Sequence, residues 1–372
     1  MSVSFAIFIC MLAVLSAFVL SRFEQARAFK RFQNLDGLRG VAAVSVMISH
    51  ASFWYGYYRG GAWGHPPAPH FHFYTHLGSG AVAMFFMLTG FLFWGKVRTS
   101  PTLDWERLYR SRVFRIFPMY ATSTGIMLLI AAFVMRPLLA QHLTSLLFSI
   151  ATFRQSHFWD RPYMFGILDA GVTWTLAYEW FFYFSLPVQA GILYYRKMTV
   201  IRGVLLTGLA VLLFLMFTVS HLDTRLLTLF VCGILAYEFG RGVRWQILRE
   251  RLSGTVGAIL IVLFLVMAIH YFSNAYASGA ILLYAGIFGI LVAGNTLFGL
   301  LTSAPLRILG DISYSVYLLH GIVLYFGFRV LQPGSIYQFW LSIGVITVVT
   351  ILLANMTYRF IERPCMLSST SS

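Results

Sequence analysis

Charged residues are scarce in this chain. Of its 372 residues, 10% are charged and 59% are hydrophobic, and the mean hydropathy is +0.77; these values exclude an ordinary soluble domain. Apolar runs long enough to cross a hydrocarbon core of about 30 Å recur from one end of the chain to the other. No stretch between them is long enough to fold as a separate soluble domain. The composition therefore predicts an all-α, polytopic transmembrane helical bundle.

Cysteine clusters, processing signals and internal repeats are also lacking. The three cysteines, Cys10, Cys232 and Cys365, show neither disulfide nor metal-ligand spacing. The first apolar run, Val3 to Leu20, has no cationic segment before it and no small-residue cleavage pattern, so we expect a retained helix. No pair of matching Gly/Pro-broken spans is visible, which argues against an inverted-repeat transporter without excluding one.

Acidic residues are few, because 12 Asp and Glu stand against 27 Lys and Arg, a formal charge of +15. The basic residues lie in alternate loops, so they indicate membrane topology rather than nucleic-acid binding. The positive-inside rule makes these loops cytoplasmic, with the N-terminus outside and the C-terminus inside. The basic clusters are Arg22 to Arg39, Lys96 to Arg115, Arg196 to Arg202, Arg241 to Arg251, Arg307, and Arg359 to Arg363.

About eleven spans follow from the apolar runs and the loop charges. The segment from His142 to Phe153 is apolar but short, and a crossing there would invert every later basic cluster, so we interpret it as buried or re-entrant. The loops Gly56 to His76 and Arg136 to Gly171 then form the outer walls of a site, and Ser21 to Phe32 lies along the inner interface. The expected spans are 3–20, 38–56, 77–95, 116–135, 172–195, 202–219, 225–240, 254–272, 278–299, 312–331 and 337–357.

Ionisable residues at membrane depth are the first candidates for chemistry, because each costs about 3 kcal/mol or more there. At a rise of about 1.5 Å per residue, His50 lies roughly 18 Å from Leu38 at the cytoplasmic face. Glu179, counted from Val172 at the outer boundary, lies about 20 Å from that face. The two side chains therefore fall at nearly the same level, where a carboxylate can orient a histidine that acts as a base. A purely structural His–Glu pair is the alternative.

Further polar residues gather along one later span and at the inner face. Tyr314, Tyr317 and His320 share one helix face, where they line a pocket or simply pack. Basic flanks are expected from topology alone, but the density of guanidinium groups suits the phosphates of a nucleotide-like donor. These arginines are Arg39, Arg107, Arg110, Arg112 and Arg115. The outer-loop residues His65, His70, His72 and His76 have no Cys or acidic partners, so we predict no metal site.

Several motifs, taken in order, resemble the acyltransferase 3 family of integral-membrane acyltransferases over roughly Phe32 to Pro364. Where the family usually has Ser, this chain has Thr89 and Thr175, and both keep a hydroxyl. The motifs are LDGLRGVAA followed by His50, FFMLTGF (85–91), RSRVFRIFPMY (110–120), TWTLAYEWFFYF (173–184), ISYSVYLLH (312–320) and YRFIERP (358–364).

The resemblance implies a ten-helix core, so we expect an N-terminal helix and basic linker at 1–31, an acyltransferase 3-like membrane domain at 32–364 and a short cytoplasmic tail at 365–372. It implies transfer of an acyl group, most often acetyl, from cytoplasmic acyl-CoA to a hydroxyl of a cell-surface or lipid-linked saccharide, such as O-antigen, exopolysaccharide or a nodulation oligosaccharide. Because the chain stops at Ser372, we expect a stand-alone enzyme of the bacterial inner membrane, without a fused esterase-like domain.

Acyl-CoA is then a co-substrate, the acceptor saccharide and the lipid bilayer are the other partners, and neither a tightly bound cofactor nor nucleic acid is expected. The alternatives are transfer of succinyl or another acyl group, a small lipid or antibiotic acceptor, a glycolipid transporter or flippase, and a non-catalytic sensor of surface glycans. The arginine cluster favours an acyltransferase over a proton-coupled carrier, which needs no phosphate-binding group beside its midplane site.

The resemblance also implies that Arg39 and His50 are essential. We expect His50 to be the general base on the acceptor hydroxyl and Glu179 to orient it, with an acyl-imidazole intermediate as the alternative. Trp174, Trp180 and Tyr183 stack on sugar rings or belong to an interfacial aromatic belt. The predicted catalytic residues are His50, Glu179 and Arg39; the donor-binding residues are Arg39, Arg112, Arg115 and Tyr120; the pocket residues are Asp36, Trp174, Trp180, Tyr183, Tyr314, Tyr317 and His320.

Overall fold

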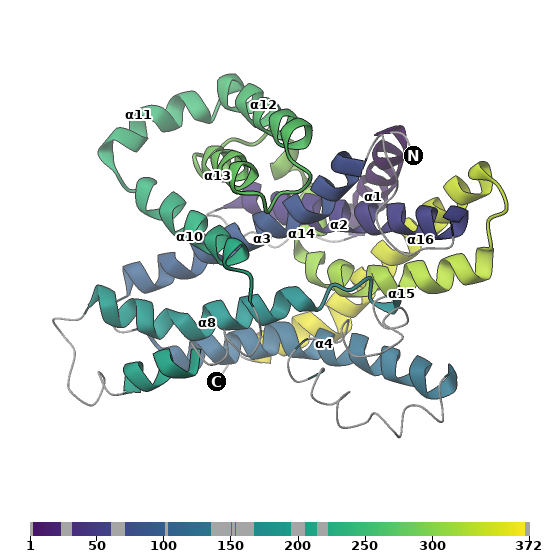
Figure 1. Cartoon of the computed structure of the whole chain (residues 1–372), viewed down its shortest axis with the longest axis horizontal. Coiled ribbons are helices and arrows are strands. Elements are labelled where there is room, and N and C mark those ends of the chain that lie inside the picture. The colour runs from purple at the N-terminus through teal and green to yellow at the C-terminus, as the bar shows by residue number, and fades with distance from the viewer. Residues whose placement is uncertain are drawn as a thin grey trace.

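The computed structural model describes residues 3–23, 32–60, 71–100, 103–134, 150, 153, 167–194, 205–213 and 222–368, and all the regular structure within these ranges is helical (Figure 1). The named elements are α1 (Val3–Phe23), α2 (Gln33–Gly60), α3 (Phe71–Thr99), α4 (Trp105–Val134), α8 (Trp174–Leu193), α10 (Thr224–Phe239), α11 (Val243–Leu252), α12 (Thr255–Tyr271), α13 (Ser278–Val292), η3 (Leu300–Thr302), α14 (Ala304–Asp311), α15 (Ser313–Leu331), α16 (Ile336–Thr357), η4 (Tyr358–Glu362) and α17 (Arg363–Ser368).

Five of the described helices are long and apolar enough to cross a membrane, which confirms a helical membrane protein. A sixth crossing exists if α11 and α12, which meet at an angle of 80°, are one broken span. The figure of about eleven spans stays a prediction. The segment His142 to Phe153 and the loop around His65 and His70 lie almost wholly outside the described residues. The five helices are Val3–Phe23, His72–Thr99, Trp105–Ile130, Ser313–Leu331 and Ile336–Ser368.

Helix α2 packs against α3, α14 and α15. Its first turns carry two glycines whose backbone touches α14 and the turn before it. A Cβ on Gly37 would lie 1.9 Å from the carbonyl oxygen of Leu301, and one on Gly40 would lie 2.6 Å from that of Leu306. Only glycine allows this approach, because real Cβ atoms do not come so close to a carbonyl. The LDGLRG motif therefore brings Asp36 and Arg39 next to the start of α15.

Helices α3, α8 and α10 are joined through stacked aromatic rings. The Phe230 ring of α10 stacks on Phe86 of α3 and on Phe182 of α8, with both centroid distances 4.6 Å. Pro187 interrupts α8 and cannot donate to the carbonyl of Tyr183, four residues earlier. The Tyr109 hydroxyl of α4 donates to that carbonyl at 3.1 Å and so satisfies it. Figure 1 shows α4 and α8 along one side of the molecule and α10 to α13 on the other.

A buried turn precedes α8. The Asp169 carboxylate accepts from the Gly171 backbone N–H at 2.7 Å and from the Thr173 hydroxyl at 3.3 Å. Both Asp169 and Thr173 are about 1% exposed. The turn packs on the middle of α15, since a Cβ on Gly321 would lie 2.4 Å from the carbonyl carbon of Asp169. Helix α8 therefore starts inside the protein.

The chain ends in an unusual turn. Helix α16 runs into η4, a single π-helical turn, and then into the short helix α17. Pro364 follows closely; its ring crowds the carbonyl four residues back and it has no N–H to donate there, which favours a widened turn. This turn places Glu362, at 0% exposure, in the core. The segment expected as a cytoplasmic tail begins within α17, whose Met366 contacts Arg115.

Candidate active site

A cavity of about 420 Å³ lies between α2, α3, α4, α8 and α15. This volume is within the range of small-molecule sites. Its lining combines apolar side chains of α3 with polar side chains of the other helices. The charged lining residues are Asp36, Arg39, Lys96, Arg112, Arg115, Glu179 and Asp311.

The basic side chains of the cavity have donors available for a ligand. Within the described part of the chain, Arg39, Lys96 and Arg112 form no ion pair. Arg112 and Lys96 lie over the Phe93 ring, 5.0 and 4.9 Å from its centroid, where cations interact favourably with the aromatic face. Arg115 pairs with Glu362, with 3.1 Å between Nη1 and Oε2. Guanidinium groups with unused N–H donors suit phosphoryl oxygens.

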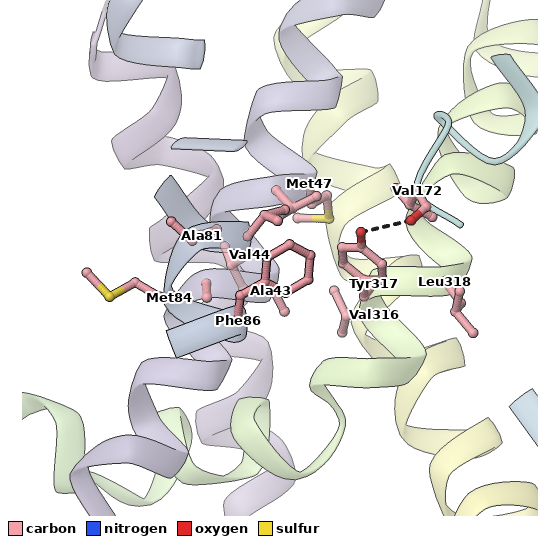
Figure 2. Close-up of a cluster of buried hydrophobic side chains, with 14 of the residues drawn as sticks. Ala43, Val44, Met47, Ala81, Met84, Phe86, Val172, Val316, Tyr317 and Leu318 are labelled. Atoms are coloured by element: carbon pink, nitrogen blue, oxygen red, sulfur yellow. Dashed lines mark hydrogen bonds between the residues drawn. The ribbon is translucent and has the colours of Figure 1, made fainter. Parts of the chain in front are cut away.

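Two hydroxyls lie deeper in the same cavity. The Tyr317 hydroxyl donates to the carbonyl of Val172 at 2.9 Å, as Figure 2 shows. It also lies 2.9 Å from the Thr175 hydroxyl, and both residues line the cavity. The buried side chains around it come from α2, α3 and α15 (Figure 2). The Tyr317 ring centroid is 6.3 Å from that of His320, so Tyr317 lies between this part of the cavity and a pair of histidines.

His50 of α2 and His320 of α15 form that pair. Their Nδ1 and Nε2 atoms are 2.8 Å apart, and the two rings are nearly parallel, with an interplanar angle of 13°. His320 is fully buried, whereas His50 is partly exposed. Helix α15 carries His320 on the face that packs against α2. The sequence predicted both residues for the site but did not predict their contact.

The hydrogen bonds of this pair define its tautomers. The other ring nitrogen of His320, Nδ1, is 3.0 Å from the carbonyl of Val316. A carbonyl only accepts, so Nδ1 of His320 carries the proton and Nε2 of the neutral ring accepts. Nδ1 of His50 must then donate to it, which places the lone pair of His50 on Nε2. A histidine held in one tautomer with the lone pair on its other ring nitrogen is suited to accept a proton.

Glu179 lines the cavity. The hydrogen bond to its carboxylate, within the described residues, comes from the Tyr183 hydroxyl one turn further along α8. The histidine of α15, His320, contacts His50, so the pairing of His50 with Glu179 stays a prediction.

The other predicted residues divide into two groups. Asp36, Arg39, Arg112, Arg115, Tyr183, Tyr314 and Tyr317 line the cavity. Arg39 precedes His50 by about three turns, or roughly 16 Å, so it belongs to the basic part of the cavity. The predicted residues that are not among the lining residues are His50, His320, Tyr120, Trp174 and Trp180. The Tyr120 hydroxyl donates to the carbonyl of Ile150 at 2.7 Å, and Trp180 packs on Phe117.

Residues that the sequence reasoning missed are Lys96, Thr175 and Glu362. The first was considered only as part of a basic loop, and the second only as a departure from a motif. Glu362 lies in the YRFIERP motif, but no local pattern indicates that a carboxylate near the C-terminus reaches Arg115, about 250 residues earlier. Among the described residues, no group of three or more His, Cys, Asp or Glu is arranged to hold a metal ion.

Comparison with known proteins identifies the family to which this chain belongs. The model of an acyltransferase domain, the acyltransferase 3 family, matches residues 32–359. Nodulation protein 10 of Rhizobium leguminosarum bv. viciae is 28% identical over 362 residues, which cover 91% of this chain and 94% of the relative. O-acetyltransferase OatA of Staphylococcus aureus (strain NCTC 8325 / PS 47) is 25% identical over 376 residues; 92% of this chain and 58% of the relative are covered. No solved structure matches the chain.

Proposed function

Because the chain belongs to the acyltransferase 3 family and is therefore an acyltransferase, we propose that it moves an acetyl group from acetyl-CoA to a hydroxyl of a cell-surface or lipid-linked saccharide. The observation that carries this proposal is one continuous cavity with two chemically different parts. Arginines and a lysine line one part, and Tyr317, which lines the other, lies beside His320 of the His50–His320 pair. The name of the Staphylococcus aureus relative, an O-acetyltransferase, supports acetyl as the group and oxygen as the acceptor.

The donor lies along this cavity. Its phosphates contact Arg39, Arg112 and Lys96, which form no ion pair among the described residues, and its pantetheine arm runs past the apolar side chains of α3. The thioester then reaches Thr175 and Tyr317. Basic residues of membrane proteins gather on the cytoplasmic side, so the donor enters from the cytoplasm, with the protein in a bacterial inner membrane, its N-terminus outside and its C-terminus inside.

The transfer uses His50 as general base. Nε2 of His50 takes the proton of the acceptor hydroxyl while the acceptor oxygen forms a bond to the acyl carbon. The carbon–sulfur bond breaks and the CoA thiolate leaves. The protonated His50 then gives the proton from the acceptor hydroxyl to the thiolate, which forms the CoA thiol. His320 accepts from Nδ1 of His50 throughout, which holds the tautomer and stabilises the positive charge that forms on the ring. It thus has the role that the sequence assigned to Glu179, analogous to the third member of a catalytic triad.

Transfer of labelled acetyl from acetyl-CoA to cell-envelope glycans tests the proposal. The assay uses membranes that carry equal amounts of wild type, His50→Ala or His270→Ala. His270 is an exposed residue near the end of α12 and outside the cavity, so it is the matched control. We expect label with wild type and His270→Ala and none above background with His50→Ala. Equal labelling by all three would refute His50 as the base, and a labelled His50 trapped on the protein would indicate an acyl-imidazole route.

A further inference from the structure

Glu362 is a fully buried carboxylate to which the reaction assigns no role. It closes the π-helical turn η4 and is 0% exposed. The Ser315 hydroxyl of α15 donates to one oxygen, Oε1, and Thr357 donates in turn to the Ser315 oxygen at 3.0 Å. A carboxylate without water costs much free energy unless a charge and hydrogen bonds compensate it. In this protein the compensating charge is Arg115, a cavity residue.

The guanidinium of Arg115 makes its polar contacts with protein groups through one nitrogen, Nη1. Its Nη1 lies 3.1 Å from Oε2 of Glu362 and 3.2 Å from the Met366 sulfur, and its guanidinium lies 5.9 Å from the centroid of Tyr314. Within the described residues, its Nε and Nη2 donate to no protein group. The side chain keeps 14% exposure and lines the cavity. The C-terminal turn therefore fixes one edge of the guanidinium and leaves the other edge for a ligand.

We propose that Glu362 is a positioning residue for the donor: it fixes Arg115 so that the Nε and Nη2 edge binds a phosphoryl group of coenzyme A. The identity of the donor rests on the proposed function. Two effects of Glu362 on phosphate binding oppose each other. Its negative charge weakens the attraction between Arg115 and an anion, whereas its ion pair with Nη1 holds the guanidinium in the geometry that two parallel N–H···O bonds require. The positioning of Arg115 is the larger effect in this proposal, so loss of the Glu362 carboxylate weakens the binding of coenzyme A.

Binding of coenzyme A to the purified full-length protein in detergent measures which effect dominates. The proteins compared are wild type, Glu362→Gln, Glu362→Asp and Ser315→Ala. Glu238→Gln is the matched control, because Glu238 pairs with the partly exposed Arg98 outside the cavity. Pantetheine, which has no phosphate, is the second probe. We expect Glu362→Gln to weaken coenzyme A binding about tenfold, or about 1.4 kcal/mol, to leave pantetheine binding unchanged, and Glu362→Asp to restore part of the affinity.

The outcomes separate the two proposals. If Glu362→Gln binds coenzyme A as tightly as wild type or more tightly, Glu362 acts only by its charge and the positioning role is overturned. If Glu362→Gln does not fold, judged by thermal unfolding in detergent, Ser315→Ala replaces it. Ser315→Ala is expected to weaken coenzyme A binding about threefold, since it removes one hydrogen bond that orients the carboxylate. Unchanged affinity in Ser315→Ala then overturns the role, and a wild type that binds no coenzyme A contradicts the proposed donor as well.

Discussion

Replacement of His320 by Phe tests the histidine pair directly. The change removes the Nε2 acceptor that lies 2.8 Å from Nδ1 of His50 and keeps a planar ring in a fully buried position. His50 then loses the partner that fixes its tautomer and stabilises its protonated form. A hydrogen bond to a charged group contributes about 1.5–3 kcal/mol, which corresponds to a loss of about 10- to 150-fold in kcat. The KM for acetyl-CoA is expected to change little, because the basic part of the cavity is untouched.

Acetyl transfer by purified protein, with acetyl-CoA varied, separates kcat from KM for this variant. His320→Gln is the control, because its side-chain oxygen can accept from Nδ1 of His50 and is expected to recover part of the rate. Thermal unfolding in detergent shows whether each variant is folded. A folded His320→Phe protein whose kcat stays within about threefold of wild type would refute the assigned tautomer and the role of His320, since less than about 0.7 kcal/mol would then be lost.

Two further predictions concern the fold and the second predicted catalytic residue. Gly40→Ala is expected to destabilise the protein by about 1–3 kcal/mol, because its Cβ would meet the Leu306 carbonyl at 2.6 Å. Thermal unfolding checks this against Gly289→Ala, whose Cβ would have no neighbour within 4 Å, and equal unfolding temperatures would contradict it. Glu179→Gln is expected to lower kcat less than His320→Phe does, since the residue that contacts Nδ1 of His50 is His320. A larger loss in the same transfer assay would make Glu179 the residue that orients His50.

Helix positions were the most predictable part of this protein. Hydropathy and loop charge identified the apolar helices, and α15 and α16 match their expected ranges within one or two residues. The LDGLRG glycines belonged to a recognised motif, but their physical reason, contact with α14 and the turn before it, is visible only in the fold. Helix α2 exceeds its expected span because hydropathy detects the apolar part of a helix and not its polar continuation.

Depth along a helix was the least predictable part. Counting residues from an assumed membrane boundary gave a common level for His50 and Glu179, but it did not predict that His320 contacts His50 or that α8 begins at the buried turn stabilised by Asp169. No motif or periodicity in the sequence indicates that turn. A shift in where a helix begins changes which residues meet across helices, since each residue advances about 1.5 Å and rotates the side chain to another face.

A helical membrane acyltransferase can be predicted from the amino-acid sequence alone, because hydrophobic length, loop charge and motif order are local properties of the chain. The sequence also placed His50, His320 and the arginines of the cavity among the candidates. The pairs His50–His320 and Arg115–Glu362 are visible only in the folded protein, because they join residues 270 and 247 positions apart. Such pairs depend on how helices are rotated and offset against one another, and those quantities are set by the packing of whole helix faces.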